Sequence, residues 1–268
     1  MNTYIFNDNM RFFYPIKIAL DLVEQAEIVY PNPFDDNLSY FKKCIEKANP
    51  YGLFLEFGVH RGSSIEKIAN LTSEKVYGFD SFEGIPEKWH NMEAHAFSLG
   101  GEVPEGPLRS MDQYLDFEDK SASKETGEWP KNIELIKGWF EDSVPKFAKR
   151  EEIKNRKISF LHIDCDLYTS TKTIFEHLGH LIEEGTIIAF DEIYGYERFE
   201  EHEAFAFAEF LISDNFDYEP LFRVRGANKT KHRYGMTQGC FRIKKRTTPL
   251  AGYGTLANIP PRNNEILL

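Results

Sequence analysis

Several features are scarce in this 268-residue sequence, and each scarcity excludes a class of protein. The three cysteines, Cys44, Cys165 and Cys240, lie far apart and form no metal-type spacing, so we expect reduced thiols and no disulfide framework. No hydrophobic run is long enough to span a membrane, and residues 1–10 lack the basic and apolar regions of a signal peptide. These absences predict a cytoplasmic protein without a membrane partner.

Basic residues are fewer than acidic ones. Lys and Arg together number 32 against 43 Asp and Glu, which gives a formal net charge of −11. Phosphate backbones and anionic membranes repel such a protein, so neither is expected as the main partner, although residues 223–246 are locally basic. Internal repeats are also missing. The remaining composition, 41% hydrophobic and 28% charged, is ordinary for a globular protein.

Short apolar segments alternate with segments of helical periodicity from residue 53 onward. This pattern predicts an α/β fold, a doubly wound and mostly parallel seven-stranded sheet. The last two strands follow each other across a basic loop and are expected to form an antiparallel pair. The strands are expected at 53–59, 75–79, 133–136, 158–163, 186–190, 218–224 and 239–243.

Three regions are expected along the chain. Residues 1–52 form an N-terminal helical extension, 53–246 the main domain and 247–268 a tail of little periodicity. The extension carries helices over 16–29 and 36–48, the second capped by Asp35 or Asp36. Within the main domain, 89–130 is a long insertion with one helix near 108–117. Such a segment is a functional loop over a ligand or a surface excursion.

The segment 53–84 carries the clearest chemical signal. A buried strand runs into Glu56-x-Gly58-x-x-x-Gly62, Ser63 or Ser64 caps a helix, and a second strand ends at Asp80. Glycine lets the backbone approach a ligand, and a helix N-terminus favours a negative group. A carboxylate at the tip of the next strand accepts hydrogen bonds from ribose hydroxyls. The unit suits a ligand with a ribose and an anionic group, and its glycine spacing counts against NAD.

Aromatic residues follow the third strand of the main domain. After Gly138 come Trp139 and Phe140, and Glu141 or Asp142 is expected to begin a helix. An aromatic ring at this place is well positioned to stack on adenine. The alternative is that both rings pack between helix and sheet.

Four acids follow the fourth and fifth strands: Asp164, Asp166, Asp191 and Glu192. Ligands of open α/β sheets bind where parallel strands end, so these carboxylates are expected to lie close together. Crowded carboxylates repel unless a cation lies among them, and oxygen ligands suit Mg²⁺, Mn²⁺ or Ca²⁺. We predict a metal site with Asp164, Asp191 and Glu192 as ligands and Asp166 as an alternative ligand. Alternatively, one or two of these acids only cap helices.

A bound divalent ion lowers the pKa of a substrate hydroxyl and fixes its direction. The catalytic candidates are Asp164 and, as general bases, Asp166, His202 and His232. His60 lies in the glycine turn and is expected to be a hydrogen-bonding or packing residue. His162 lies inside a strand and is expected in the core.

Together, these motifs resemble class I S-adenosylmethionine (SAM) methyltransferases, and within them the macrocin O-methyltransferase (TylF-type) group. The similar stretches are 58–62, 80–84, 137–140, 161–171 (LHIDCDLYTST) and 190–195. Cys165 and Glu192 depart from the group, which has Gly and Asp there. The resemblance covers about residues 53–245.

The resemblance implies a SAM- and Mg²⁺-dependent O-methyltransferase whose small-molecule substrate offers a hydroxyl of a sugar or other polyol. In this group the early acid, here Glu56, organises the turn beneath the methionine part, and Asp80 holds the ribose. Arg61 holds the SAM carboxylate or merely a surface acid. The expected cofactor-binding residues are Glu56, Gly58, His60, Arg61, Gly62, Ser63, Asp80, Ser81, Phe82, Gly138, Trp139, Phe140 and Asp164.

Two other functions stay open at this point. One is a SAM- or nucleotide-binding regulatory protein without transfer activity, and the other is an NAD-dependent oxidoreductase. The four acids count against the first, because a silent site has no reason to keep carboxylates crowded. Relatives of this kind often associate through N-terminal helices, so a homo-oligomer is also considered.

Overall fold

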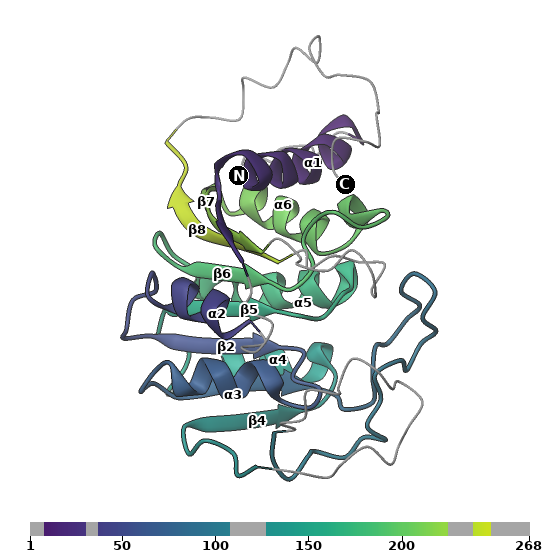
Figure 1. The fold of residues 1–268 in the computed structure, drawn as a ribbon, viewed down its shortest axis with the longest axis vertical. Helices are drawn as coiled ribbons and strands as arrows, with labels where there is room; N and C mark the ends of the chain where they lie inside the picture. Colours follow the sequence, from purple (N-terminus) through teal and green to yellow (C-terminus); the bar gives the residue numbers. More distant parts are fainter. Residues whose placement is uncertain (1–7, 31–36, 108–126, 225–237, 248–268) are drawn as a thin grey trace.

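The computed structural model describes residues 8–30, 37–107, 127–224 and 238–247, and it centres on one eight-stranded sheet (Figure 1). The strand order is β1-β7-β8-β6-β5-β2-β3-β4, and β8 alone runs antiparallel to its neighbours β6 and β7. The strands are β1 Glu27–Val29, β2 Leu53–Phe57, β3 Val76–Asp80, β4 Ile133–Lys137, β5 Ile158–Ile163, β6 Ile187–Phe190, β7 Phe216–Val224 and β8 Gly239–Lys245. The predicted doubly wound sheet and its antiparallel pair are confirmed.

Helices cover both faces of the sheet. They are α1 Asp8–Gln25, α2 Leu38–Ile45, α3 Ser63–Asn70, α4 Phe140–Ala148, α5 Tyr168–Leu178 and α6 Glu203–Ser213. Figure 1 shows α2 and α3 in front of the sheet and α4 and α5 behind it. One hydrophobic cluster lies between the sheet and α2 and α3, and the other joins α1, α4, α5 and α6 to the opposite face.

The predicted strand number was too low by one. The helix expected over 16–29 ends at Gln25, and residues 27–29 pair in parallel with β7 as an added edge strand. The sequence did not reveal this strand, because three residues are too few to show the alternating apolar and polar pattern of a β-strand. No helix of the described residues is long and apolar enough to cross a membrane.

Two predicted helix starts were also wrong. Neither Ser63 nor Ser64 caps α3: Gly62 stands at its N-cap with a φ of +83°, and Ser64 donates its hydroxyl to Glu56 instead. Helix α4 begins at Phe140, one residue before the first expected start. The expected caps Asp35 and Asp36, the helix near 108–117 and the tail from 248 lie outside the described residues.

Side chains alternate between the two faces of the sheet along β2 and β5, and this alternation decides which of them face α2 and α3. Leu55 packs in the cluster with α4 and α5, whereas Phe54 packs in the cluster with α2 and α3. Glu56 therefore points toward α2 and α3, and its register partner on β5 is His162. Both side chains are fully buried, so this face of the sheet carries polar groups inside its core.

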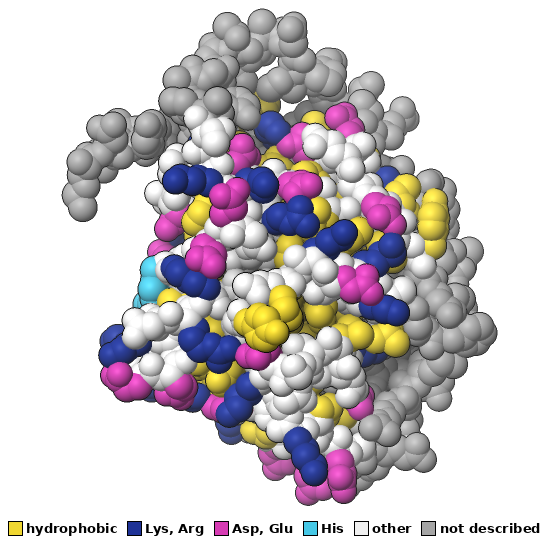
Figure 2. Space-filling model, turned by 90° about the vertical axis from the view of Figure 1, so that its left-hand side faces the viewer, with side chains coloured by type: hydrophobic (Ala, Val, Ile, Leu, Met, Phe, Trp, Pro, Cys, Tyr) yellow, Lys and Arg dark blue, Asp and Glu magenta, His cyan; other side chains and the backbone are white. Residues whose placement is uncertain are grey.

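Figure 2 views the end of the molecule at which the parallel strands begin, opposite to the end at which they finish. Basic and acidic side chains are interspersed over that face. The three cysteines are free and buried, as expected.

Candidate active site

A cavity of about 860 Å³ lies at the carboxyl ends of the parallel strands, which is where ligands of such sheets bind. It is large enough for a nucleoside-sized ligand and an acceptor. The predicted site residues that line it are Gly58, His60, Arg61, Ser63, Asp80, Ser81, Trp139, Phe140, Asp164, Asp166, Asp191 and Glu192. These twelve predicted residues therefore lie around one cavity, which is also lined by residues that were not predicted as part of the site, among them Asn37, Phe41 and Tyr196.

Five other predicted residues do not line the cavity: Glu56, Gly62, Phe82, Gly138 and His202. A side chain at Gly62 would meet the ring of Trp129 at 2.2 Å, so Gly62 is covered rather than open to a ligand. Phe82 is buried in the core on the α2 and α3 side. His232 lies outside the described residues.

Asp80 holds the glycine turn after β2 in place. Its Oδ2 accepts hydrogen bonds from the backbone N–H groups of Val59 at 2.9 Å and His60 at 2.7 Å, and its Oδ1 accepts one from Phe82 at 2.6 Å. Burial raises the pKa of Asp80, and these three backbone donors act against that rise. The acid predicted to bind a ribose thus also orders the turn beside it.

Gly58 is required at the end of β2. It has a φ of +94°, and a Cβ there would lie 1.7 Å from the backbone oxygen of Asp164. Gly185 has a similar φ of +98°, but a Cβ there would meet nothing within 4 Å. The two positions therefore separate the cost of a left-handed backbone from the cost of a collision.

The variant Gly58→Ala is expected to lower the free energy of unfolding by about 3 kcal/mol or more, and Gly185→Ala by only about 1–2 kcal/mol. The difference comes from the displaced Asp164 backbone. Urea unfolding of both variants measures it. Equal losses of unfolding free energy in the two variants would show that the glycine turn can move away from Asp164 without destabilising the fold.

His60 and Arg61 present different chemistry to the cavity. Burial, and then the charge of Arg61, lowers the pKa of His60 to about 4, so its imidazole is neutral at pH 7. The Nε of Arg61 is buried and has no hydrogen-bond partner within the described part of the chain. A cavity wall with an unsatisfied guanidinium donor suits an anionic ligand group such as a carboxylate.

Trp139 and Phe140 take different roles. Trp139 precedes α4 and lines the cavity. The ring of Phe140 also lines it but packs edge-on against Phe57, with ring centroids 5.3 Å apart. Phe140 therefore packs against the sheet, as the alternative expected, and also reaches the cavity.

The acids after β5 and β6 lie side by side. The N–H of Asp164 donates to Phe57 O at 2.9 Å, and the N–H of Asp191 donates to Ile163 O at 3.0 Å, so the parallel pairing continues to both acids. Burial, followed by the charge of Asp191, raises the pKa of Asp164 well above its usual value. The same two causes raise the pKa of Glu192 strongly and that of Asp166 to about 7. The predicted crowding is therefore present.

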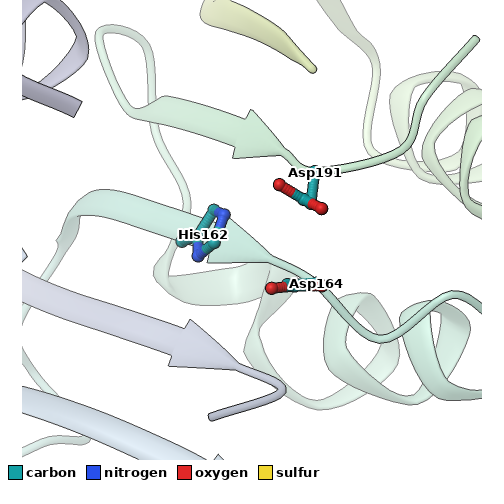
Figure 3. A group of neighbouring side chains, drawn as sticks. All are labelled: His162, Asp164 and Asp191. Carbon is teal, nitrogen blue, oxygen red and sulfur yellow. The ribbon is translucent and has the colours of Figure 1, made fainter. Parts of the chain in front are cut away.

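Figure 3 shows a cluster that the sequence did not predict as a unit. Among the described residues, the ligand atoms of His162, Asp164 and Asp191 all lie within 4.8 Å of one another. Glu192, the third predicted ligand, is not in this cluster, and its Oε2 is buried with no hydrogen-bond partner in the described part of the chain. The side-chain amide of Gln238 donates a hydrogen bond to Oδ1 of Asp191.

Glu203 was missed by the sequence analysis. It lies in the first turn of α6, fully buried, and its Oε1 accepts the backbone N–H groups of Cys165 at 3.2 Å and Asp166 at 3.1 Å. Burial, followed by Asp166, raises its pKa well above normal. It fixes the loop in which Asp166 has a φ of +64°. The available signal was an acid at the start of the mostly apolar segment 203–212, which also contains Glu209.

Two histidines lie beside each other near the acids. His202, a predicted base, is the N-cap residue of α6 and does not line the cavity, and its ring centroid is 5.6 Å from that of His90. His90 does line the cavity and belongs to the predicted insertion. Burial lowers the pKa of both rings. Trp89, Met92 and Phe97 of the same insertion also line the cavity, so this segment contributes to the site.

The sheet order, with its antiparallel β8 next to β6, and a cavity between a glycine turn and two strand-end acids define a class I methyltransferase fold. The sequence model of the macrocin O-methyltransferase (TylF) family matches residues 35–207, and the chain belongs to this family.

Individual relatives are more distant. The 8-demethyl-8-(2,3-dimethoxy-alpha-L-rhamnosyl)-tetracenomycin-C 4'-O-methyltransferase of Streptomyces olivaceus is 29% identical over 166 residues, or 59% of each chain. The match therefore spans less than two thirds of that relative. Among solved structures, the O-methyltransferase NovP is 19% identical with a TM-score of 0.47, covering 78% of this chain and 80% of NovP. The calicheamicin methyltransferase CalS11 is 16% identical with a TM-score of 0.48, covering 88% and 83%.

Proposed function

We propose that this protein is a SAM-dependent O-methyltransferase that methylates a hydroxyl of a sugar or other small polyol. One observation carries the proposal: a single cavity joins the glycine turn held by Asp80 to the acids Asp164, Asp166 and Asp191. A methyl donor on the turn and an acceptor hydroxyl at the acids would face each other within it. Methyl transfer from a sulfonium is an in-line displacement, so this placement is what the reaction needs.

The lining residues fit SAM group by group. Arg61 has a buried donor without a partner and would bind the carboxylate of the methionine part. Oδ1 of Asp80 accepts only the backbone N–H of Phe82, whereas Oδ2 accepts two, so Oδ1 retains acceptor capacity and would bind a ribose hydroxyl. Trp139 would stack on the adenine. SAM supplies the activated methyl group when bound, and these residues orient it.

The acid cluster fits a divalent cation. Asp164 and Glu192 both have pKa values raised by burial and by neighbouring charges, and a cation among them would remove that repulsion. Asp164, Asp191 and Glu192 would hold Mg²⁺ or a similar ion, which supplies Lewis acidity toward the acceptor hydroxyl. Asp166 lines the same cavity as these ligands, and its position suits it to take the proton of the acceptor hydroxyl.

The acceptor class follows from chemistry and from a relative. The Streptomyces olivaceus enzyme is named for methylation of a rhamnosyl 4'-oxygen. A sugar hydroxyl is a weak nucleophile at neutral pH, so it benefits from both a cation and a base. A panel of rhamnosides, other glycosides and nucleotide sugars, incubated with methyl-labelled SAM, tests the proposal. Label in at least one glycoside supports it, and label in none contradicts the acceptor class.

Removal of divalent ions is expected to lower methyl transfer by about a hundredfold or more, with recovery on adding Mg²⁺ or Mn²⁺. Labelled-methyl transfer measured in EDTA, and again after metal addition, provides the test. Calorimetry with S-adenosylhomocysteine in the same buffers is the control, because the cofactor is proposed to bind at the glycine turn and Asp80 without the metal. Full turnover in EDTA would remove the metal from the proposal and leave methyl transfer intact.

A further inference from the structure

His162 is a buried imidazole whose ring atoms need partners. It is fully buried on β5, and neither ring nitrogen has a hydrogen-bond partner among the described residues. A buried polar atom left without a partner costs about 1–3 kcal/mol. A core position would be satisfied more cheaply by an apolar side chain, so the placement of His162 points to a ligand.

Acidic groups flank the ring on two sides. Nδ1 of His162 lies 3.7 Å from Oε1 of Glu56, its register partner on β2. A ring nitrogen also lies within 4.8 Å of carboxylate oxygens of Asp164 and Asp191, which follow the ends of β5 and β6 on the same face (Figure 3). The ring of Phe41 packs edge-on against the imidazole at a centroid distance of 5.0 Å. The plane of the ring is therefore held between Glu56 and the two aspartates.

We propose that His162 is a nitrogen ligand of a divalent transition-metal ion held together with Asp164 and Asp191. Glu56 is the positioning residue: a carboxylate that accepts the Nδ1 proton leaves Nε2 for the metal, which is the usual arrangement behind a metal-binding histidine. Ligands with bonds of about 2.1 Å lie at most about 4.2 Å apart around one ion. The three atoms, within 4.8 Å of one another, therefore need only small side-chain movements to close on it.

The nitrogen ligand sets the metal preference. Mg²⁺ prefers an all-oxygen shell, whereas imidazole with carboxylates suits Mn²⁺, Co²⁺ or Zn²⁺. The role of this ion in methyl transfer rests on the proposed function, but the site itself does not. The rival interpretation is that His162 is a protonated counter-ion of the aspartates and binds no metal.

Pulsed electron paramagnetic resonance of the full-length protein, stripped with EDTA and reloaded with Mn²⁺, tests the ligand directly. We expect ¹⁴N modulation from a bound imidazole in the wild type and in His180→Gln, which changes an exposed histidine, and its loss in His162→Gln. Labelling the unsubstituted protein with ¹⁵N-histidine must convert the signal to that of ¹⁵N. This arm needs no variant to fold.

Calorimetric titrations with Co²⁺ and Mg²⁺ measure the preference. His162→Gln is expected to raise the Kd for Co²⁺ about tenfold or more and to change that for Mg²⁺ less than about threefold, while Glu56→Gln raises the Kd for Co²⁺ about tenfold. No nitrogen modulation with Mn²⁺ bound, or unchanged Co²⁺ affinity in His162→Gln, overturns the proposal. S-adenosylhomocysteine binding without the nitrogen signal would reject only the ligand. A nitrogen signal without cofactor binding would reject only the methyltransferase assignment.

Discussion

Replacing Asp80 with alanine is expected to raise the Kd for S-adenosylhomocysteine about a thousandfold or more. Three backbone N–H groups, those of Val59, His60 and Phe82, lose a charged acceptor. Without this acceptor the turn that shapes the cofactor site loses its order, and a ribose hydrogen bond to a carboxylate contributes about 1.5–3 kcal/mol, where every 1.4 kcal/mol is about tenfold in affinity. The ribose would lose its acceptor as well. Isothermal titration of the variant measures the loss.

Two further variants define the cause. Asp80→Asn keeps the shape but turns an amide donor toward backbone donors, so it is also expected to bind poorly. Glu83→Gln removes a nearby exposed acid and should bind as the wild type does. A Kd for Asp80→Ala within about threefold of the wild type would place the cofactor elsewhere. Titration of the wild type with NAD should give no heat, and tight NAD binding would favour the oxidoreductase alternative.

Replacing Asp166 with asparagine is expected to lower kcat for methyl transfer about 10²–10⁴-fold and to leave S-adenosylhomocysteine affinity unchanged. Asp166 lines the cavity, and burial together with Asp191 raises its pKa to about 7, which suits a general base at neutral pH. Asparagine tolerates the φ of +64° at this position, so the variant should keep the backbone. Initial rates with the acceptor found in the glycoside panel provide the measurement.

The matched control is Asp217→Asn, which neutralises an exposed acid on β7 and should retain the wild-type rate. Thermal unfolding of Asp166→Asn should stay close to that of the wild type, because Glu203 binds the backbone N–H rather than the side chain of residue 166. If Asp166→Asn keeps half of the wild-type rate, another group takes the proton, and His90 would be the next residue to test.

The sequence predicted the arrangement of the glycine turn and Asp80 well, because the signals for this part of the site are local. Gly58 and Asp80 belong to one strand-turn-helix-strand unit, and the hydrogen bonds between its turn and its acid form within about twenty residues of chain. Asp164 and Asp191 were equally accessible, since the ends of parallel strands meet at one edge of the sheet. Each of these two acids directly follows an apolar strand in the sequence, and this position alone predicts where it lies in the fold.

The residues that sequence analysis did not connect with the site depend on contacts across the fold. His162 reads as an ordinary strand residue until β2 brings Glu56 beside it and Asp191 follows β6. Glu203 needs α6 to dock its first turn on the loop after β5. Neither contact has a periodicity in the sequence. The start of α3 was misjudged for a related reason, because Ser64 is satisfied by the buried Glu56 rather than by the helix end.

The N-terminal segment is not separable from the pocket. Asn37 and Phe41, at the start of α2, line the cavity together with the glycine turn, while β1 extends the sheet beyond β7. A chimaera that exchanges residues 1–52 between family members would therefore exchange part of the pocket wall. Acceptor choice in such hybrids should follow the donor of that segment, and a fragment trimmed to begin at β2 would open the pocket to water on that side.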